Sequence, residues 1–169
     1  MLYVLLAPGP SMSQAVADRV RAQNVGVVNN CYELAPWATF LASSDAAWWE
    51  KNPAAIFFAG DTYAAAVVDG VERIQCAEVR NGTNSGVLAL EVAKRRGADR
   101  IALLGFDMRG SHYFGPYTNG LNNTCPERRR VHHAQFKLWR DANPSIAVVN
   151  CTPGSALQCF PFGDLDDLL

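Results

Sequence analysis

Short apolar runs alternate with amphipathic stretches along the whole chain. Each run is short, apolar and mostly bounded by glycine, proline, asparagine or aspartate, which is typical of buried strands. The predicted strands cover residues 2–6, 25–28, 40–42, 56–58, 101–104 and 146–149, with a weaker one within 71–76. Strands that alternate with helices form a mostly parallel sheet with helices on both faces. The pattern therefore predicts the α/β fold class.

Three helices are predicted between these strands. The first begins at Ser11, where Gln14 three residues later completes a capping-box pattern, and it ends near residue 24. The second follows Asn84-Ser85-Gly86 and ends in a basic turn, which suits a helix C-terminus. The third begins at Thr124, with Glu127 three residues later as its capping-box partner, and runs to about residue 141, before an asparagine-proline pair that stops it.

The composition fits one well-filled domain. The chain has 169 residues, of which 49% are hydrophobic and 18% are charged. Such a chain is too apolar for intrinsic disorder, and its length suits a single domain over residues 1–169. Its net charge of −1 provides no broad positive field for a nucleic-acid backbone. Nucleic-acid binding steered by long-range electrostatics is therefore not expected.

The cysteines indicate a reducing compartment and no metal site. Their number is odd and no two of them form a C-x-x-C pair, so neither a disulfide framework nor a zinc ribbon fits. They are Cys31, Cys76, Cys125, Cys151 and Cys159. The apolar run at the start of the chain is far shorter than the roughly 20 residues of a membrane span, and it is predicted to be a strand. We expect a cytoplasmic protein with free thiols.

The strongest local signal is the turn Gly9-Pro10-Ser11 between the first strand and the first helix. A glycine turn that leads into a helix offers backbone N–H groups and the helix dipole to an anion such as a phosphate. It is neither a P-loop nor a dinucleotide fingerprint, because Gly9 is its only glycine and the lysine is missing. An ordinary capped turn is an equally good interpretation.

A second turn of similar chemistry, residues 81–86, opens the second helix. It reads Asn81-Gly82-Thr83-Asn84-Ser85-Gly86. Ligands of open α/β sheets bind outside the carboxyl ends of the strands. We therefore expect Asn84, Ser85 and Gly86 to bind a ligand from the side opposite to Gly9. The alternative is a helix cap joined to a flexible surface loop.

Further polar side chains follow the other predicted strands. They are Asn29 and Asn30 after the second strand, Ser43, Ser44 and Asp45 after the third, and Asp107. A base or ribose would be held by the Asn29 amide and by Ser44 or Asp45. Each of these residues alone is as well explained by local turn chemistry. Trp48 and Trp49 would either stack on the ligand or pack in the core, and the sequence does not separate these alternatives.

A long aperiodic stretch, residues 105–125, contains the best catalytic candidate. Its imidazole, His112, would act as a general base or bind a leaving phosphate, and a structural histidine is the alternative. His132 and His133 lie in the third predicted helix and point about 100° apart, so they are interpreted as structural. The basic run 128–130 opposes the dipole at the start of that helix and would suit an anionic ligand, although a solvated face is preferred.

Several of these segments together form a familiar series that runs in order over most of the chain. They are Gly9-Pro10-Ser11, Asn29, Asn84-Ser85-Gly86-Val87, Leu104-Gly105-Phe106-Asp107, Ser111-His112-Tyr113-Phe114-Gly115, and residues 151–157. The series resembles the bacterial sialyltransferase-like proteins. These are the Campylobacter-type lipooligosaccharide sialyltransferases and related Rossmann-like proteins, many of them from tailed bacteriophages.

The resemblance implies a Rossmann-like fold that binds a cytidine or other nucleotide sugar without a metal or a further cofactor. It implies nucleotide contacts from Gly9, Ser11, Asn29, Ser85 and Gly86. It also places Tyr113 near the departing phosphate. The chain departs from the family at Pro116, which stands where the family has its catalytic histidine. His112 is then the nearest replacement base, and Asp107 is the other candidate.

The preferred interpretation is a cytoplasmic, phage-associated glycosyltransferase-like protein that binds a nucleotide sugar. One alternative is a pterin pyrophosphokinase-like enzyme, which ranks lower because the sequence has no carboxylate pair suited to magnesium. Another is a non-catalytic phage assembly or host-interaction protein. The acceptor stays unspecified, and assembly into a homo-oligomer is left open.

Overall fold

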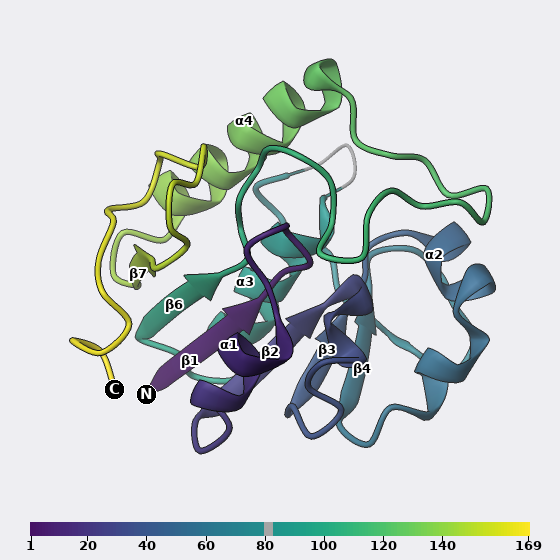
Figure 1. Cartoon of the computed structure of the whole chain (residues 1–169), viewed down its shortest axis with the longest axis horizontal. Coiled ribbons are helices and arrows are strands. Elements are labelled where there is room, and N and C mark those ends of the chain that lie inside the picture. Colours follow the sequence, from purple (N-terminus) through teal and green to yellow (C-terminus); the bar gives the residue numbers. More distant parts are fainter. Residues whose placement is uncertain (80–82) are drawn as a thin grey trace.

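The computed structural model describes residues 1–79 and 83–169 (Figure 1). Within these residues seven strands form one parallel sheet with the order β5-β4-β3-β2-β1-β6-β7. The strands are β1 (Leu2–Leu6), β2 (Asn24–Val28), β3 (Phe40–Ala42), β4 (Asp61–Ala64), β5 (Glu72–Arg73), β6 (Arg100–Leu104) and β7 (Ala147–Asn150). The predicted α/β class is confirmed, and the architecture is Rossmann-like.

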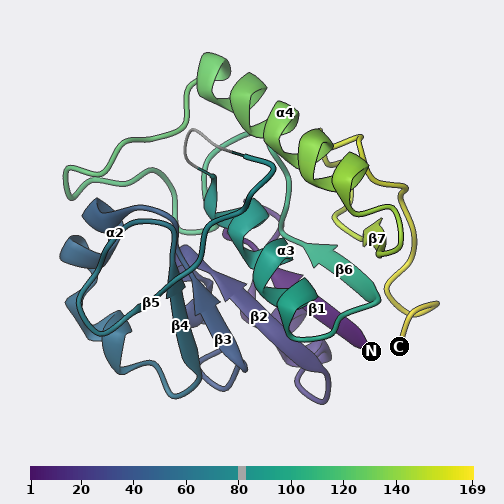
Figure 2. The same ribbon diagram turned by 180° about the vertical axis from the view of Figure 1, so that it is seen from behind.

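Helices cover both faces of this sheet. They are α1 (Gln14–Arg19), α2 (Ala46–Lys51), α3 (Ser85–Arg95) and α4 (Pro126–Ala142), joined by the short 3₁₀ turns η1 (Asn29–Tyr32) and η2 (Pro53–Phe57). One apolar core lies under α3 and α4, and a second lies under α1 and α2 (Figures 1 and 2). In the described part of the chain, none of these helices combines the length and the apolar character needed to cross a membrane.

The sheet has a switch point between β1 and β6. From β1 the chain builds the sheet outward to β5, and α3 then carries it back to β6 on the other side of β1. Leu6 and Leu104, the last residues of these two strands, are partners in the register. The turns that follow β1 and β6 are therefore neighbours, at the edge where ligands of such sheets commonly bind.

The predicted strand at residues 56–58 is wrong. The chain forms η2 there, beginning at Pro53, and Phe57 is 84% exposed. The true fourth strand begins at Asp61, and its first residues are polar and partly solvated, so no apolar run marks it. The weak strand within 71–76 is present only as the two exposed residues of β5. Helix α2 was not predicted at all.

The predicted helices differ from the observed ones at their ends, and α1 ends at Arg19 and not near residue 24. Helix α1 begins at Gln14 and not at Ser11, because Ser13 is the cap and accepts a hydrogen bond from Val16 N at 3.3 Å. Helix α3 begins as predicted, with Asn84 Oδ1 accepting from Val87 N at 3.0 Å. Helix α4 follows Cys125 and has no side-chain cap. The predicted capping box at its start is therefore absent.

Candidate functional site

A cleft of about 910 Å³ lies at the carboxyl ends of the strands. Its walls come from the turns after β1, β2 and β6, the first turns of α2 and α3, the loop that leads to α4, and the first half of α4. Most of the predicted ligand-binding residues line it. They are Gly9, Asn29, Ser44, Asp45, Asn84, Ser85 and Gly86. Asn81 and Gly82 of the same predicted turn lie outside the described residues.

Four predicted site residues do not line the cleft. They are Pro10, Ser11, Asp107 and Tyr113. Ser11 instead borders a smaller cavity of about 640 Å³ beside the C-terminal segment. Of the three catalytic candidates, only His112 faces the cleft.

The turn after β1 is closed by the protein's own atoms. Asp107, which is 3% exposed, accepts hydrogen bonds from Ser11 Oγ at 2.8 Å and from Ser11 N at 3.3 Å. Gly9 N donates to Gly105 O, and Met12 N donates to Gly9 O. These amides are therefore not available to an anion, and the expected phosphate site at this turn is corrected.

Glycine is required at Gly9 by close packing. A Cβ added there would lie 2.1 Å from Asp107 Oδ2 and 2.3 Å from Gly105 O. The glycine that the sequence suggested for ligand approach thus allows the turns after β1 and β6 to pack together. A ligand-binding turn and a closely packed turn both require backbone without a side chain, so a glycine in the sequence does not distinguish them.

The start of α3 retains the chemistry expected of it. The amides of Ser85 and Gly86 belong to the first turn of the helix, which has no intrahelical acceptors for its N–H groups. Ser85 Oγ accepts from Ser44 N at 2.9 Å and lies 3.1 Å from Ser44 Oγ. A Cβ on Gly86 would lie 2.7 Å from the Phe136 ring, so α4 packs closely here. This wall combines a helix dipole, two hydroxyls and the amides of Ser85 and Gly86, which have no acceptor among the described residues.

Two strained residues lie on the cleft. Asn29 has φ of 47° and Met108 has φ of 55°, both in the left-handed region that non-glycine residues seldom occupy. Asn29 Oδ1 is buried and has no hydrogen-bond partner among the described residues. Strain and an unsatisfied polar atom are costly, and both concentrate where ligands bind.

Asn30, expected only as one of the polar residues that follow the second strand, anchors the long loop above the cleft. Its Oδ1 accepts from Trp48 Nε1 and from Tyr117 OH, each at 3.0 Å. Its backbone oxygen accepts from Tyr113 OH at 3.0 Å. Burial raises the pKa of Tyr113, so this phenol stays protonated and serves as an anchor. Trp48, whose role was left open, packs in the core and also borders the cleft.

His112 is held in a form suited to accept a proton. Its ring stacks on Phe114 with a 4.8 Å centroid separation, and Nδ1 lies 3.2 Å from Gly115 O. A Nδ1–H donated to this carbonyl leaves the lone pair on Nε2. Burial lowers the pKa of His112 and nearby Arg129 lowers it further, so the ring is neutral at pH 7.

The opposite wall is cationic. It contains Arg109 from the long loop and Arg128, Arg129 and His132 from α4. Arg128 and Arg130 are exposed, in agreement with the solvated face preferred from the sequence, and Arg128 and Arg129 also border the cleft. His132, interpreted as structural, is also part of the lining.

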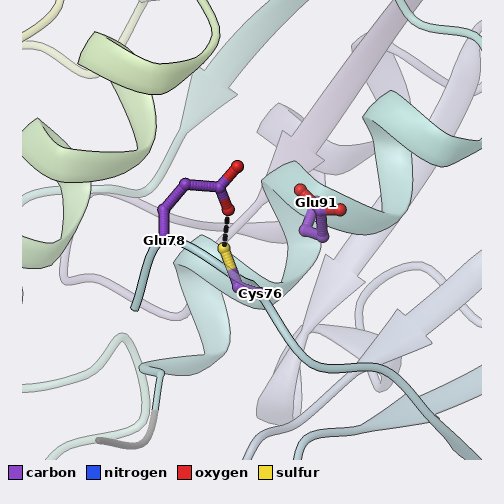
Figure 3. A group of neighbouring side chains, drawn as sticks. All are labelled: Cys76, Glu78 and Glu91. Carbon is purple, nitrogen blue, oxygen red and sulfur yellow. Dashed lines mark hydrogen bonds between the residues drawn. The ribbon is translucent and has the colours of Figure 1, made fainter. Parts of the chain in front are cut away.

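A second polar cluster lies away from this cleft. Cys76, Glu78 and Glu91 have ligand atoms within 4.8 Å of one another, a grouping that could suit a metal ion (Figure 3). The thiol donates to Glu78 Oε2 at 3.0 Å. Burial, followed by this hydrogen bond, raises the pKa of Cys76 to about 12. The sulfur is therefore a protonated thiol at neutral pH, and a metal ion would have to displace its proton.

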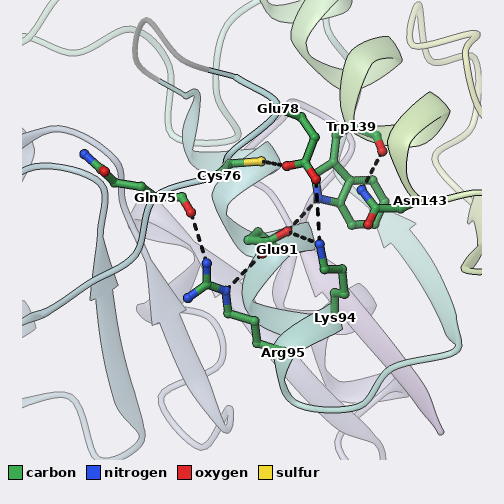
Figure 4. A network of polar contacts seen from close by, with 8 residues as sticks. All are labelled: Gln75, Cys76, Glu78, Glu91, Lys94, Arg95, Trp139 and Asn143. Carbon is green, nitrogen blue, oxygen red and sulfur yellow. Dashed lines mark hydrogen bonds and ion pairs between the residues drawn. The ribbon is translucent and has the colours of Figure 1, made fainter.

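Glu91 in this cluster is already neutralised by the protein. It pairs with Lys94 Nζ at 2.8 Å and with Arg95 Nε at 3.0 Å, and it accepts from Trp139 Nε1 at 3.1 Å (Figure 4). A cation would have to compete with two side-chain cations for this carboxylate. The cluster is a polar clamp that joins α3 to α4.

The functional groups of the cleft are thus a free helix start, a strained asparagine, a neutral histidine and a cationic wall. Comparisons of the chain with protein-family models, with curated protein sequences and with solved structures give no match.

Proposed function

We propose that this protein binds a nucleotide or a nucleotide sugar in the cleft. The observation that carries the proposal is the convergence of Asn29, Ser44 and the first turn of α3 on one cavity at the carboxyl edge of the sheet. The α3 amides would bind a phosphate oxygen, and the side-chain amide of Asn29 would bind the base or ribose. The resemblance to the sialyltransferase-like proteins supports the same ligand class.

The reaction we propose is glycosyl transfer with His112 as the base. Nε2 of His112 would take the proton of an acceptor hydroxyl while the acceptor oxygen forms a bond to the anomeric carbon. The bond from that carbon to the phosphate oxygen would break, and the nucleotide would leave with the electron pair. The start of α3 would stabilise the charge that develops on the phosphate.

Ligand binding is tested by thermal shift and calorimetry with the cytidine, uridine and guanosine monophosphates and their sugar nucleotides. The informative variant is Asn29→Gly. Glycine adopts the positive φ without strain, so this change removes the amide without harming the fold. We expect unchanged or higher stability and at least tenfold weaker binding. Ser145→Ala, an exposed change beyond α4, is the control. A panel with no binder contradicts the proposal.

A binding-only function is the second candidate. It is favoured because Asp107 and Tyr113 are engaged in structural hydrogen bonds, which leaves His112 as the sole cleft-lining member of the predicted catalytic set. Replacement of His112 by glutamine separates the two. A transferase would keep ligand affinity and lose release of sugar from the bound sugar nucleotide. A binding protein would show no such release before or after the change.

A further inference from the structure

The cleft holds more positive charge than its own acids neutralise. Three arginines line it, Arg109, Arg128 and Arg129, against two acids, Asp45 and Glu127. This excess occurs in a chain whose net charge is −1, so it is a local feature.

The two acids leave the arginines unpaired. Glu127 pairs with Arg130, which lies outside the cleft, with 3.5 Å between Oε1 and the guanidinium. Asp45 interacts with His132. Burial and Arg128 lower the pKa of His132, and Asp45 opposes them by a smaller amount. Within the described ranges, Arg109, Arg128 and Arg129 form no ion pair with a carboxylate.

One contact joins the two segments that carry these arginines. Arg129 donates to the backbone oxygen of Gly110, which ties the start of α4 to the loop that carries Arg109. Arg128 and Arg129 lie in the first turn of α4, where the helix dipole is already positive. Their charges also act on the cleft histidines, because Arg129 lowers the pKa of His112 and Arg128 lowers that of His132. Mutual repulsion of this kind is relieved by a bound anion.

The start of α3 forms a separate electropositive feature. It is built from backbone amides and the hydroxyls of Ser44 and Ser85, and no arginine of the other wall hydrogen-bonds to it. The two features therefore differ in chemistry. Amides at a helix start suit one phosphate group, and guanidinium forks suit another.

We infer that the ligand carries at least two anionic groups, with a nucleoside diphosphate portion as the matching chemistry. The inference rests on the proposed function and specifies its substrate class. One phosphate would lie at the start of α3, and the next would lie against Arg109, Arg128 and Arg129. Guanidinium groups bind phosphate through paired hydrogen bonds, so removal of one fork weakens binding of the second phosphate only.

The test measures affinities of the monophosphate and diphosphate of cytidine, uridine and guanosine, together with inorganic pyrophosphate, by calorimetry in EDTA. For the wild-type protein we expect at least tenfold tighter binding of the diphosphate of the preferred base. Arg128→Gln and Arg109→Gln should each reduce this preference while leaving monophosphate affinity within about twofold. Arg130→Gln on the same helix is the matched control and should leave the preference intact, since Arg130 does not border the cleft.

The outcomes separate the inference from the proposed function. Equal affinity for the mono- and diphosphate in the wild-type protein overturns the inference and leaves nucleotide binding in place. An equal effect of the Arg128 and Arg130 variants overturns it as well, because the charge would then act non-specifically. Binding of pyrophosphate without any nucleotide supports two anion positions and contradicts the proposed nucleotide function. No binding by any probe overturns both.

Discussion

The carboxylate of Asp107 accepts a hydrogen bond from Ser11 Oγ at 2.8 Å and so joins two turns that lie 96 residues apart. The contact sits at the switch point between β1 and β6. It fills the position where a ligand phosphate was expected with a side-chain carboxylate of the protein itself. The proposed binding site is therefore at the start of α3 and the cationic wall, and not at this turn.

Replacement of Asp107 by alanine should destabilise the fold by about 1–3 kcal/mol, because the Ser11 amide and hydroxyl lose their acceptor in a part-buried site. Urea unfolding measures the loss. Asp107→Asn, which keeps one acceptor oxygen, should cost less. Ligand affinity at the cleft should stay within a few-fold of wild type. A variant with full stability and abolished turnover would instead restore Asp107 as a catalytic base.

The Ser11–Asp107 contact also shows what the sequence alone could reveal. Strand β1, strand β3 and the start of α3 follow from local apolar runs and a local cap, and they were predicted correctly. The acceptor of the Ser11 hydroxyl depends on strand order, which no local pattern encodes. Strand β4 escaped prediction for a similar reason, since its Asp61 and Thr62 are placed by pairing with Phe40 and Leu41 and not by their own hydrophobicity.

The same limit applies to the cleft. Polar residues after the strands were correctly expected to gather at one edge of the sheet, because carboxyl ends of parallel strands share that edge. Which face of α4 meets the cleft depends on its packing against α3 through Phe136 and Gly86. Arg128 and His132 therefore could not be assigned to the site from spacing alone.

Replacement of Asn30 by alanine should loosen the loop over the cleft. Trp48 Nε1 and Tyr117 OH would both lose their shared acceptor, and the expected cost is about 1–3 kcal/mol. Amide hydrogen exchange should quicken in residues 112–117, with little change in α1. Tyr117→Phe, which deletes one donor of the same network, serves as the partial control. Unchanged exchange in both variants would contradict the anchoring role.

Replacement of Glu91 by glutamine tests the polar clamp between α3 and α4. The change leaves Lys94 and Arg95 without their shared carboxylate, while Trp139 Nε1 keeps an oxygen acceptor. Both cations are partly solvated, so we expect a loss of about 1–3 kcal/mol, below the 3–5 kcal/mol typical of a fully buried pair. Thermal unfolding measures the loss. Arg130→Gln, which removes the exposed pair with Glu127, is the control and should have little effect.

Addition of Zn²⁺ provides a second measurement on this clamp. Because the Cys76 thiol is protonated and Glu91 is already paired, zinc should not raise the melting temperature. A rise that disappears in Cys76→Ser would show that the three side chains bind the ion. The clamp would then have a role beyond packing.

The dependence of folding stability on pH should reflect the protonation of the three histidines. Burial is the largest cause that lowers the pKa of His112, His132 and His133 below the 6.5 of an unperturbed histidine. Between their folded-state pKa values and about 6.5, the unfolded chain binds more protons than the folded one. Stability should therefore be greatest above pH 7 and fall as pH drops below 6.5, by at most about 1.4 kcal/mol per pH unit for each histidine.

Urea unfolding at intervals from pH 5.5 to 7.5 measures this slope, and the range avoids most carboxylate titration. His132→Gln should make the slope shallower by removing one of the three groups, while Ser145→Ala should leave it unchanged. A bound diphosphate should also flatten the slope, because anionic groups beside His112 and His132 favour their protonated forms. An equal slope in the wild-type protein and in His132→Gln would contradict the lowered pKa of His132, which burial and Arg128 cause.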